Sequence, residues 1–207
     1  MSMPRHQEDI PPTTPVVVKL GGSLHNHVPE LATIFIHSPR PILIVPGGGR
    51  FADAVREMKL SDEDAHWSAI RAMDQFGTHV AAFGIKTTDR LSIPVESSVL
   101  LPYRCTRHFD PLPHSWDITS DTIAAWVAGR LKLDLLVLKS VDGIRMKYGH
   151  AGTISRRVKT DVVDPCFIPY VLKHRIGTTI INGTVPDLVA AFLRGEQVPC
   201  TRIGTTF

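Results

Sequence analysis

The sequence predicts an α/β protein, a three-layer sandwich in which helices cover both faces of a mainly parallel central sheet. Short apolar runs stand at 15–20, 41–45, 97–101, 133–138 and 178–181, and none of them alternates strictly between apolar and polar residues. Helical patterns separate these runs at 50–60, 62–83, 120–131 and 186–194. Continuous apolar strands are buried on both faces, which is typical of parallel sheets packed between helices.

Each element has a local reason to begin or end where it does. Glycines at 21–22 and 47–49 stop the first two apolar runs. Thr119 or Ser120 can cap the helix over 120–131, and Pro186 suits the first turn of the last helix. The helix over 62–83 is amphipathic, because apolar residues recur every three or four positions: Ala65, Ala69, Ile70, Met73, Phe76, Val80 and Phe83.

Length and composition predict one globular domain. At roughly 150 residues per domain, 207 residues fit one domain over 15–207, after a polar, proline-containing tail over 1–14 that we expect to be disordered. The 23 basic and 20 acidic residues give a net charge of +3 without clustering, so we expect no nucleic-acid partner. No apolar run reaches the roughly 18 residues of a membrane span, so we expect no membrane partner.

The cysteines and histidines predict neither a disulfide framework nor a metal-ligating site. Cys105, Cys166 and Cys200 lie far apart and form no C-x-x-C pair, which favours a reducing, cytoplasmic location. The ten histidines lack the spacing of metal ligands. We therefore expect no protein side chain to serve as a dedicated metal ligand.

Two glycine-rich loops that follow buried strands are candidates for phosphate binding, because glycine lets backbone N–H groups approach an anion. The usual G-x-x-x-x-G-K-[ST] signature is absent. Residues 47–52 fit G-x-G-x-x-A, but the acidic residue of a dinucleotide fold is missing about 20 positions later. The other interpretation of each loop is a tight turn that binds nothing.

Lys19 stands near the end of a buried apolar run, where a charge is costly unless it is paired or used. A functional lysine there would face a transferring phosphoryl group, whose developing charge a fixed cation stabilises. The other interpretation is an edge-strand lysine whose ammonium group reaches solvent.

Five motifs in order resemble the amino acid kinase family over residues 15–204. They are Lys19-Leu20-Gly21-Gly22-Ser23, Pro46-Gly47-Gly48-Gly49, Ile118-Thr119-Ser120-Asp121, Ser140-Val141-Asp142-Gly143 and Ile181-Asn182-Gly183. The segments around Phe51-Ala52, Met73-Asp74 and His114-Ser115-Trp116 resemble a short branch of that family, the aminomethylfuran-methyl phosphate kinases of methanofuran biosynthesis. The resemblance implies the kinase fold, ATP and Mg²⁺, a small-molecule substrate, and a homo-oligomer that is a dimer or a multiple of dimers.

The resemblance also implies roles for single residues. Lys19 would contact the β- and γ-phosphates, and Asp121 would orient lysines around them, although an acid in a helix's first turn has a structural explanation too. Gly21, Gly22 and Ser23 would cradle the donor phosphates, and Gly47, Gly48 and Gly49 would serve the acceptor. Ser140, Asp142 and Gly143 would lie beside the nucleotide, although an exposed Asp-Gly turn would have the same sequence.

One expected cation is missing from its usual place. Many relatives carry a second catalytic lysine in a Met-x-Pro-Lys segment, whereas this chain has Phe167-Ile168-Pro169-Tyr170 there. Tyrosine cannot replace that charge. Lys173 or Arg175 is a candidate substitute because each lies close by in sequence.

The acceptor implied by the resemblance is a phosphate monoester, which is already anionic and needs no general base. Arg50 could grip its phosphate, or could be an ordinary exposed helix arginine. His114 and Trp116 could form a wall against a furan ring, or Trp116 could pack on the core. Two alternatives stay open: a kinase of an amino-acid or small-acid carboxylate, and a non-catalytic nucleotide-binding or storage protein.

Overall fold

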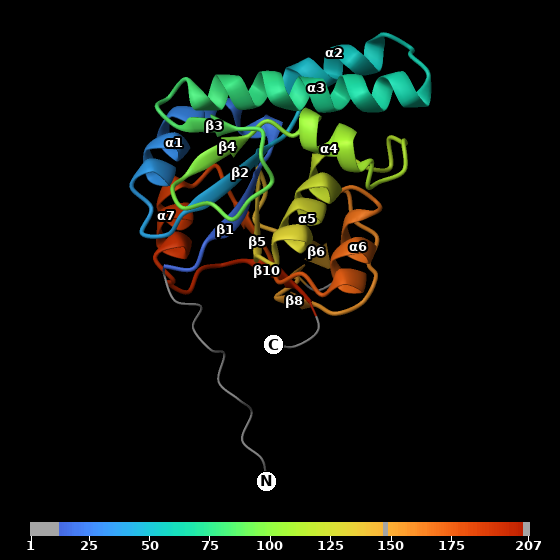
Figure 1. Ribbon diagram of the computed structural model, residues 1–207. Coiled ribbons are helices and arrows are strands. Elements are labelled where there is room, and N and C mark those ends of the chain that lie inside the picture. The colour runs from blue at the N-terminus through green and yellow to red at the C-terminus, as the bar shows by residue number, and fades with distance from the viewer. Residues whose placement is uncertain (1–12, 147–148, 205–207) are drawn as a thin grey trace.

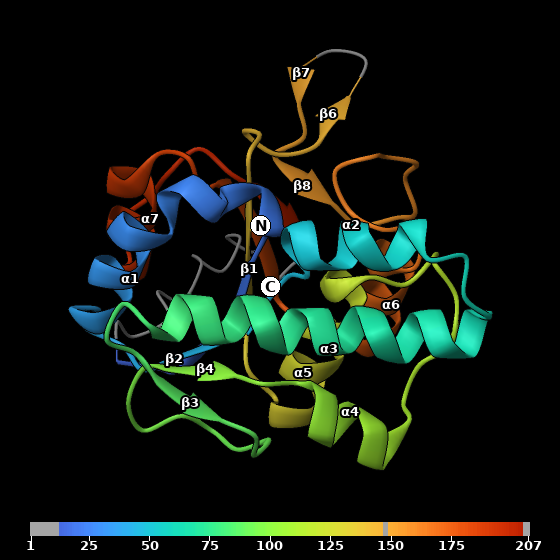
Figure 2. The same cartoon turned by 90° about the horizontal axis from the view of Figure 1, so that it is seen from above.

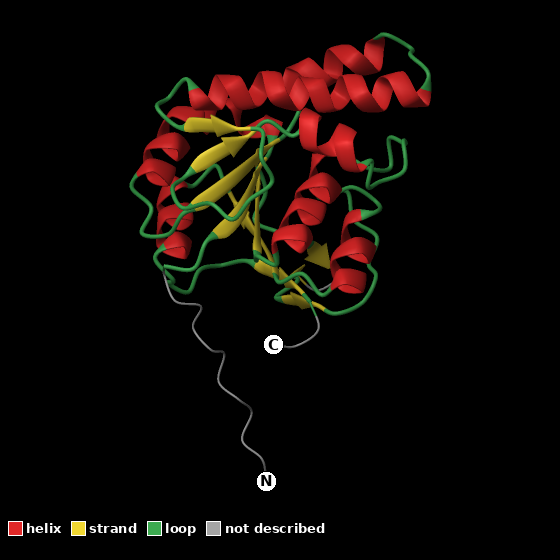
Figure 3. Cartoon of the chain, in the orientation of Figure 1, coloured by secondary structure: helices red, strands yellow, loops and turns green. Residues whose placement is uncertain are grey.

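The computed structural model describes residues 13–146 and 149–204, which build an eight-stranded sheet flanked by helices (Figures 1 and 3). The strand order is β3-β4-β2-β1-β5-β9-β10-β8. The strands are β1 (Val16–Leu20), β2 (Ile42–Pro46), β3 (Lys86–Thr88), β4 (Ser98–Leu100), β5 (Leu135–Lys139), β8 (Thr153–Ile154), β9 (Thr178–Asn182) and β10 (Thr201–Ile203). A separate hairpin pairs β6 (Arg145–Met146) with β7 (Gly149–His150).

The sheet is parallel from β3 through β9, and β10 runs antiparallel to β9 with β8 parallel to β10. The central strand β1 pairs with β2 on one side and β5 on the other. In this register Lys19 stands opposite Val45 and Val137. The predicted mainly parallel sheet is thus confirmed, and β1 lies at its centre rather than at an edge.

Helices cover both faces, as the sequence predicts (Figure 1). The short helix η1 (Gly22–His27) leads into α1 (Val28–Ile36), which packs with α7 (Pro186–Leu193) on one face. On the other face, α5 (Ser120–Leu131) and α6 (Phe167–His174) pack together, with α4 (Tyr103–Phe109) nearby. Above the sheet, α2 (Gly49–Glu57) and the long α3 (Asp62–Ala81) lie side by side (Figure 2).

The core is divided into two layers by the alternation of side chains along the strands. Val17, Val45 and Val137 face the α5 layer, whereas Val18 and Ile44 face the α1 layer. Helix α3 closes one end of both layers, since its Met73 packs in the first and its Phe76 in the second. The candidate site lies at this end of the sheet, beneath α2 and α3.

Local capping explains several helix boundaries. The Ser61 side chain accepts a hydrogen bond from Asp64 N at the start of α3, and Thr119 accepts one from Asp121 N at the start of α5. Pro186 occupies the first turn of α7, where a missing N–H costs nothing. Of the two capping candidates in the sequence, Thr119 and Ser120, it is therefore Thr119 that caps α5.

Two further findings concern the ends of the chain and membranes. Most of the predicted tail, residues 1–12, lies outside the described residues, as do 205–207, so the expected disorder of 1–14 remains a prediction. Among residues 13–146 and 149–204, every helix is too short or too polar to cross a bilayer.

Candidate active site

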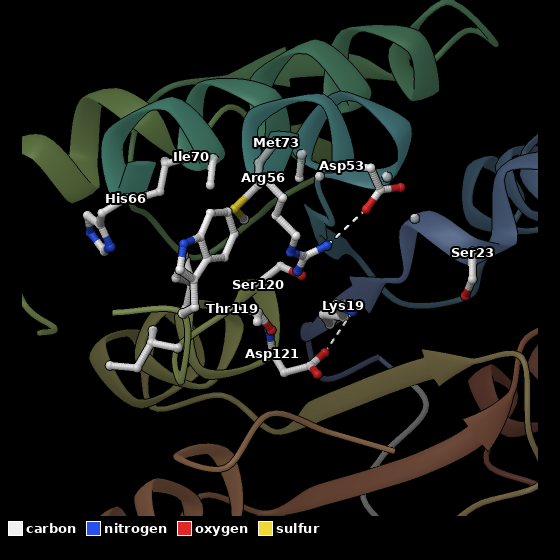
Figure 4. Close-up of a pocket in the computed structure, with 18 of the residues that line it drawn as sticks. Lys19, Ser23, Asp53, Arg56, His66, Ile70, Met73, Thr119, Ser120 and Asp121 are labelled. Atoms are coloured by element: carbon white, nitrogen blue, oxygen red, sulfur yellow. Dashed lines mark hydrogen bonds and ion pairs between the residues drawn. The ribbon is translucent and has the colours of Figure 1, made fainter. Parts of the chain in front are cut away.

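A cavity of about 380 Å³ opens at the carboxyl ends of β1, β2 and β5, bounded by α2, α3 and the start of α5 (Figure 4). From its carboxyl end β1 leads into α1 on one face of the sheet, whereas the chain after β5 leads into α6 on the other. Ligands of open parallel sheets bind where neighbouring strands diverge in this way. The cavity is therefore the candidate active site.

The two predicted glycine loops meet backbone to backbone at the mouth of β1 and β2. A Cβ at Gly22 would lie 2.3 Å from Gly49 Cα, and Gly49 itself has a φ of +50°. Gly47 N donates a 2.8 Å hydrogen bond to Leu20 O, which ties the second loop to the first strand. Only glycine at position 22 permits so close an approach, and Gly22, Gly48 and Gly49 of the two loops line one cavity.

The charged floor of the cavity consists of Lys19, Asp121 and Lys139. Lys19 Nζ lies 2.7 Å from Asp121 Oδ1, and Lys139 Nζ lies 2.7 Å from Asp121 Oδ2. The Asp121 side chain is 4% exposed, and those of Lys19 and Lys139 are 5% and 16% exposed. A buried carboxylate therefore holds two buried ammonium groups, which leaves the floor with one excess positive charge.

The ionisation of the floor follows from its burial and its three charges. Burial alone would raise the pKa of Asp121, but the ammonium groups of Lys19 and Lys139 hold that pKa below its usual value. Burial and the neighbouring Lys19 lower the pKa of Lys139 to about 8, although Asp121 acts in the opposite direction. The Asp121 carboxylate is thus ionised at neutral pH, and Lys139 loses its charge a little above neutrality.

Asp164, which the sequence analysis missed, fixes Asp121 from behind. Its carboxylate accepts hydrogen bonds from the backbone N–H and the hydroxyl of both Thr119 and Thr122, at 2.6–3.0 Å. Its own backbone N–H donates to Asp121 Oδ2 at 3.3 Å. Burial raises the pKa of Asp164, against the effect of these hydrogen bonds. Asp164 thereby anchors the first turn of α5 and the carboxylate that this turn presents.

The helical wall of the cavity, formed by α2, α3 and the Trp116 loop, is more exposed. Arg56 Nη1 donates to Asp53 Oδ1 at 2.9 Å, and the Arg56 guanidinium lies 4.9 Å from the Trp116 ring centroid. Figure 4 shows Arg56 extending into the cavity from α2, with Lys19 and Asp121 on the opposite side. Arg50 starts the same helix and lines the cavity. The wall combines aromatic, cationic and anionic groups.

A pair of stacked histidines supports this wall. The rings of His66 and His114 stack with centroids 4.2 Å apart, and His114 Nε2 lies 2.9 Å from Asp110 Oδ1. Burial and the neighbouring His114 lower the pKa of His66 to about 4, although Asp110 acts in the opposite direction. His66, which lines the cavity, is therefore neutral at physiological pH, while His114 lies behind it.

The structure brings most of the residues named from the sequence into this cavity. The lining includes Lys19, Gly22, Ser23, Gly48, Gly49, Arg50, Trp116 and Asp121. Gly21 and Gly47 belong to the same loops without lining the cavity, and His114 lies one layer back. Ser140, Asp142 and Gly143 follow β5 beyond the cavity, where Asn182 Nδ2 donates to Asp142 Oδ1 at 2.7 Å.

Lys139 is a functional candidate that the sequence did not reveal, although it has the feature that identified Lys19, a charge near the end of a buried apolar run. Lys19 is the penultimate residue of the buried strand β1, and Lys139 is the last residue of the apolar strand β5. Lys173 and Arg175, the candidates for the missing cation, are exposed at the end of α6 and do not line the cavity.

Comparison with known proteins identifies the relatives of this chain, although no protein-family model matches it. It is similar to [5-(aminomethyl)furan-3-yl]methyl phosphate kinase of Methanocaldococcus jannaschii, with 31% identity over 209 residues. The match covers 90% of this chain and 96% of that protein.

Solved structures share the fold at lower identity. Uridylate kinase from Archaeoglobus fulgidus aligns with a TM-score of 0.66 and 18% identity, over 91% of this chain and 99% of that one. UMP kinase from Ureaplasma parvum gives 0.69 and 16%, over 93% and 100%. Isopentenyl phosphate kinase gives 0.63 and 18%, over 91% and 100%. The chain belongs to the amino acid kinase family and, within it, groups with the phosphate kinases of the methanofuran pathway.

Proposed function

We propose that the protein transfers the γ-phosphoryl group of ATP to a small phosphate monoester of the [5-(aminomethyl)furan-3-yl]methyl phosphate class, forming a diphosphate. The enzyme class, a small-molecule kinase, comes from the family. One observation carries the proposal: the buried Lys19–Asp121 ion pair lies in the cavity into which both glycine loops open. Phosphoryl transfer depends mainly on positioning and on fixed positive charge. The ion pair and the loops supply the positioning, and Lys139 gives the floor its net positive charge.

The cavity suits the phosphates of a nucleotide. Gly22 and Gly49 line the cavity without side chains of their own, together with Lys19. These groups would hold the donor phosphates, while Ser140, Asp142 and Gly143 lie further along the same edge, toward the rest of the nucleotide.

The carboxylates of the cavity suit magnesium that arrives with the nucleotide. Across the described ranges, 13–146 and 149–204, no three His, Cys, Asp or Glu side chains gather as a metal site. Mg²⁺ commonly binds through substrate phosphates, waters and one or two carboxylates. Asp53 and Asp62 line the cavity, whereas both oxygens of Asp121 already pair with lysines. When bound, the ion neutralises phosphate charge.

The reaction requires no general base from the protein. A phosphate oxygen of the acceptor, already anionic, forms a bond to the γ-phosphorus as the bond from that phosphorus to the β–γ bridging oxygen breaks, and ADP leaves. The protein's part is to bring two anions together, which needs the excess positive charge of the floor and the arginines of the wall. Arg50 and Arg56 both line the cavity, and Arg56 lies on the side away from Lys19 (Figure 4).

The residues of the helical wall suit an acceptor that carries an aromatic ring and a cationic aminomethyl group. The exposed Trp116 offers an apolar face, and the carboxylates of Asp53 and Asp62 lie in the same cavity. A cationic aminomethyl group would be attracted to such carboxylates, and a furan ring would pack on the indole. Acceptors that lack the ammonium group lose the first of these contacts.

The test is a coupled ADP-release assay with purified protein, ATP, Mg²⁺ and [5-(aminomethyl)furan-3-yl]methyl phosphate. We expect turnover well above the rate without acceptor, and phosphorus NMR of the product should show the two coupled resonances of a diphosphate. UMP, isopentenyl phosphate, glutamate and aspartate serve as comparison acceptors, because the last two test a carboxylate kinase. Turnover no higher than the background with the furan phosphate would overturn the proposal.

We also infer that the enzyme works in the cytoplasm as a dimer or a multiple of dimers. The thiols of Cys105, Cys166 and Cys200 are all free, which suits a reducing compartment. Light scattering after size-exclusion chromatography checks the assembly, since a monomer at micromolar concentration would contradict it.

A further inference from the structure

Lys139 supplies the cavity with a second lysine, which the α6 segment of this chain does not provide. The segment 167–170, where that lysine would stand, forms the first turn of α6 and buries Phe167 and Ile168 in the core. No cation from this turn lines the cavity. Lys139 reaches the cavity from a different element, the carboxyl end of β5.

The strand register explains why two lysines converge. β1 and β5 are parallel neighbours, and Lys19 stands opposite Val137, so Lys139 lies two residues further toward the loops. Side chains two residues apart on a strand point to the same face. Lys19, Val137 and Lys139 therefore share the face on which α5 packs, and Asp121 in the first turn of α5 meets both ammonium groups.

The balance of charge gives Lys139 a purpose beyond pairing with Asp121. Lys19 and Asp121 alone are neutral together, and a neutral pair attracts a phosphoryl group weakly. Adding Lys139 makes the floor cationic. Each ammonium group has three N–H donors, and one contact with Asp121 leaves donors on each for phosphate oxygens.

We propose that Lys139 is a second catalytic cation, which contacts the transferring phosphoryl group together with Lys19 and replaces the lysine missing from the α6 segment. The inference rests on the proposed phosphoryl transfer and identifies a residue that carries it. The competing explanation is that Lys139 only neutralises the buried Asp121. The two differ in what happens to the γ-phosphate when the charge is removed.

The experiment compares Lys139→Met with Lys139→Arg, which keeps the charge, and with Lys173→Met, which removes an exposed lysine outside the cavity. Calorimetry with Mg²⁺ measures the binding of ADP and of a non-hydrolysable ATP analogue to each variant, and the coupled assay measures kcat. We expect Lys139→Met to weaken the analogue about tenfold more than ADP and to lower kcat by about 10²–10³. Lys139→Arg should recover at least part of both losses, and Lys173→Met should match the parent.

Two results would overturn the proposal: equal weakening of ADP and the ATP analogue by Lys139→Met, or a kcat within threefold of the parent. If the methionine variant does not fold, Lys139→Gln is judged by the same criteria, because its amide can still donate to Asp121 without a charge. The binding measurements need no acceptor. A parent protein that discriminates the ATP analogue from ADP but phosphorylates none of the acceptors would thus count against the proposed function and not against Lys139.

Discussion

The charged floor and the helical wall face the same cavity but differ in how firmly they are held. Floor side chains are 4–16% exposed and share ion pairs, whereas Arg56 and Asp53 on the wall are 52% and 67% exposed. The floor stands on two central strands and a capped helix, and the wall is formed by two helices above the sheet. This difference fits the proposed division of roles, with phosphoryl transfer at the floor and the choice of acceptor at the wall.

Asp121→Asn should have the largest effect on stability, because it leaves two buried ammonium groups without their counter-ion. Breaking a buried ion pair costs roughly 3–5 kcal/mol in the free energy of unfolding. Urea denaturation followed by circular dichroism measures it. The matched control is Asp53→Asn, which breaks an exposed pair on the wall and should cost less than about 1 kcal/mol. Equal losses would show that the floor is no more tightly coupled to the fold than the wall.

Lys19→Ala should abolish most of the turnover while the protein stays folded. Removing one fixed donor from a phosphoryl-transfer site costs about 10²–10³ in kcat. The control is Lys86→Ala, whose side chain is exposed and paired with Glu96 at a distance from the cavity. Coupled assays on both variants check the prediction. A parent protein that binds ATP tightly without any turnover would instead support a storage or sensing role.

The pH dependence of kcat/KM for ATP should follow the ionisation of Lys139 in the floor rather than that of a group in the wall. With a pKa of about 8, Lys139 is charged below that pH and loses its charge above it, while Asp121 from α5 and Lys19 from β1 face it. We expect kcat/KM for ATP to fall roughly tenfold between pH 7 and pH 9, since this parameter reports the free enzyme. In Lys139→Arg the fall should disappear, because a guanidinium group stays protonated there. An unchanged profile in the arginine variant would assign the fall to another group.

Trp116→Ala should have the smallest effect, and only on the acceptor. Loss of an aromatic contact of this kind costs roughly three- to tenfold in affinity. Initial rates at varied acceptor concentration should show a higher KM for the acceptor and an unchanged KM for ATP. A rise in the KM for ATP instead would place the nucleotide, not the acceptor, against the wall.

The parts of the fold that sequence predicted are those with a strong local pattern. The five apolar runs became β1, β2, β4, β5 and β9, and the four helical patterns became α2, α3, α5 and α7. Helices α1, α4 and α6 were not predicted, since they are only seven to nine residues long and tertiary packing rather than a long local pattern defines them. The strands β3, β8 and β10 are two or three residues long, and pairing rather than composition defines them.

The residues of the candidate site also divide into those that a local sequence pattern reveals and those that only the fold brings together. Lys19, Asp121 and the glycine loops could be named from sequence, because a charge in an apolar run and glycines after strands are visible in one dimension. Asp164 could not, since its partners Thr119 and Thr122 lie more than 40 residues away along the chain. Lys139 belongs to the floor because β5 pairs with β1, and pairing order does not follow from local pattern.

The contact between Gly22 and Gly49 has a mechanical consequence. Because the Gly49 backbone fills the space that a side chain at Gly22 would need, the first loop packs directly against the second. Donor and acceptor phosphates would then bind to one rigid unit, and the distance between them would be set before either arrives.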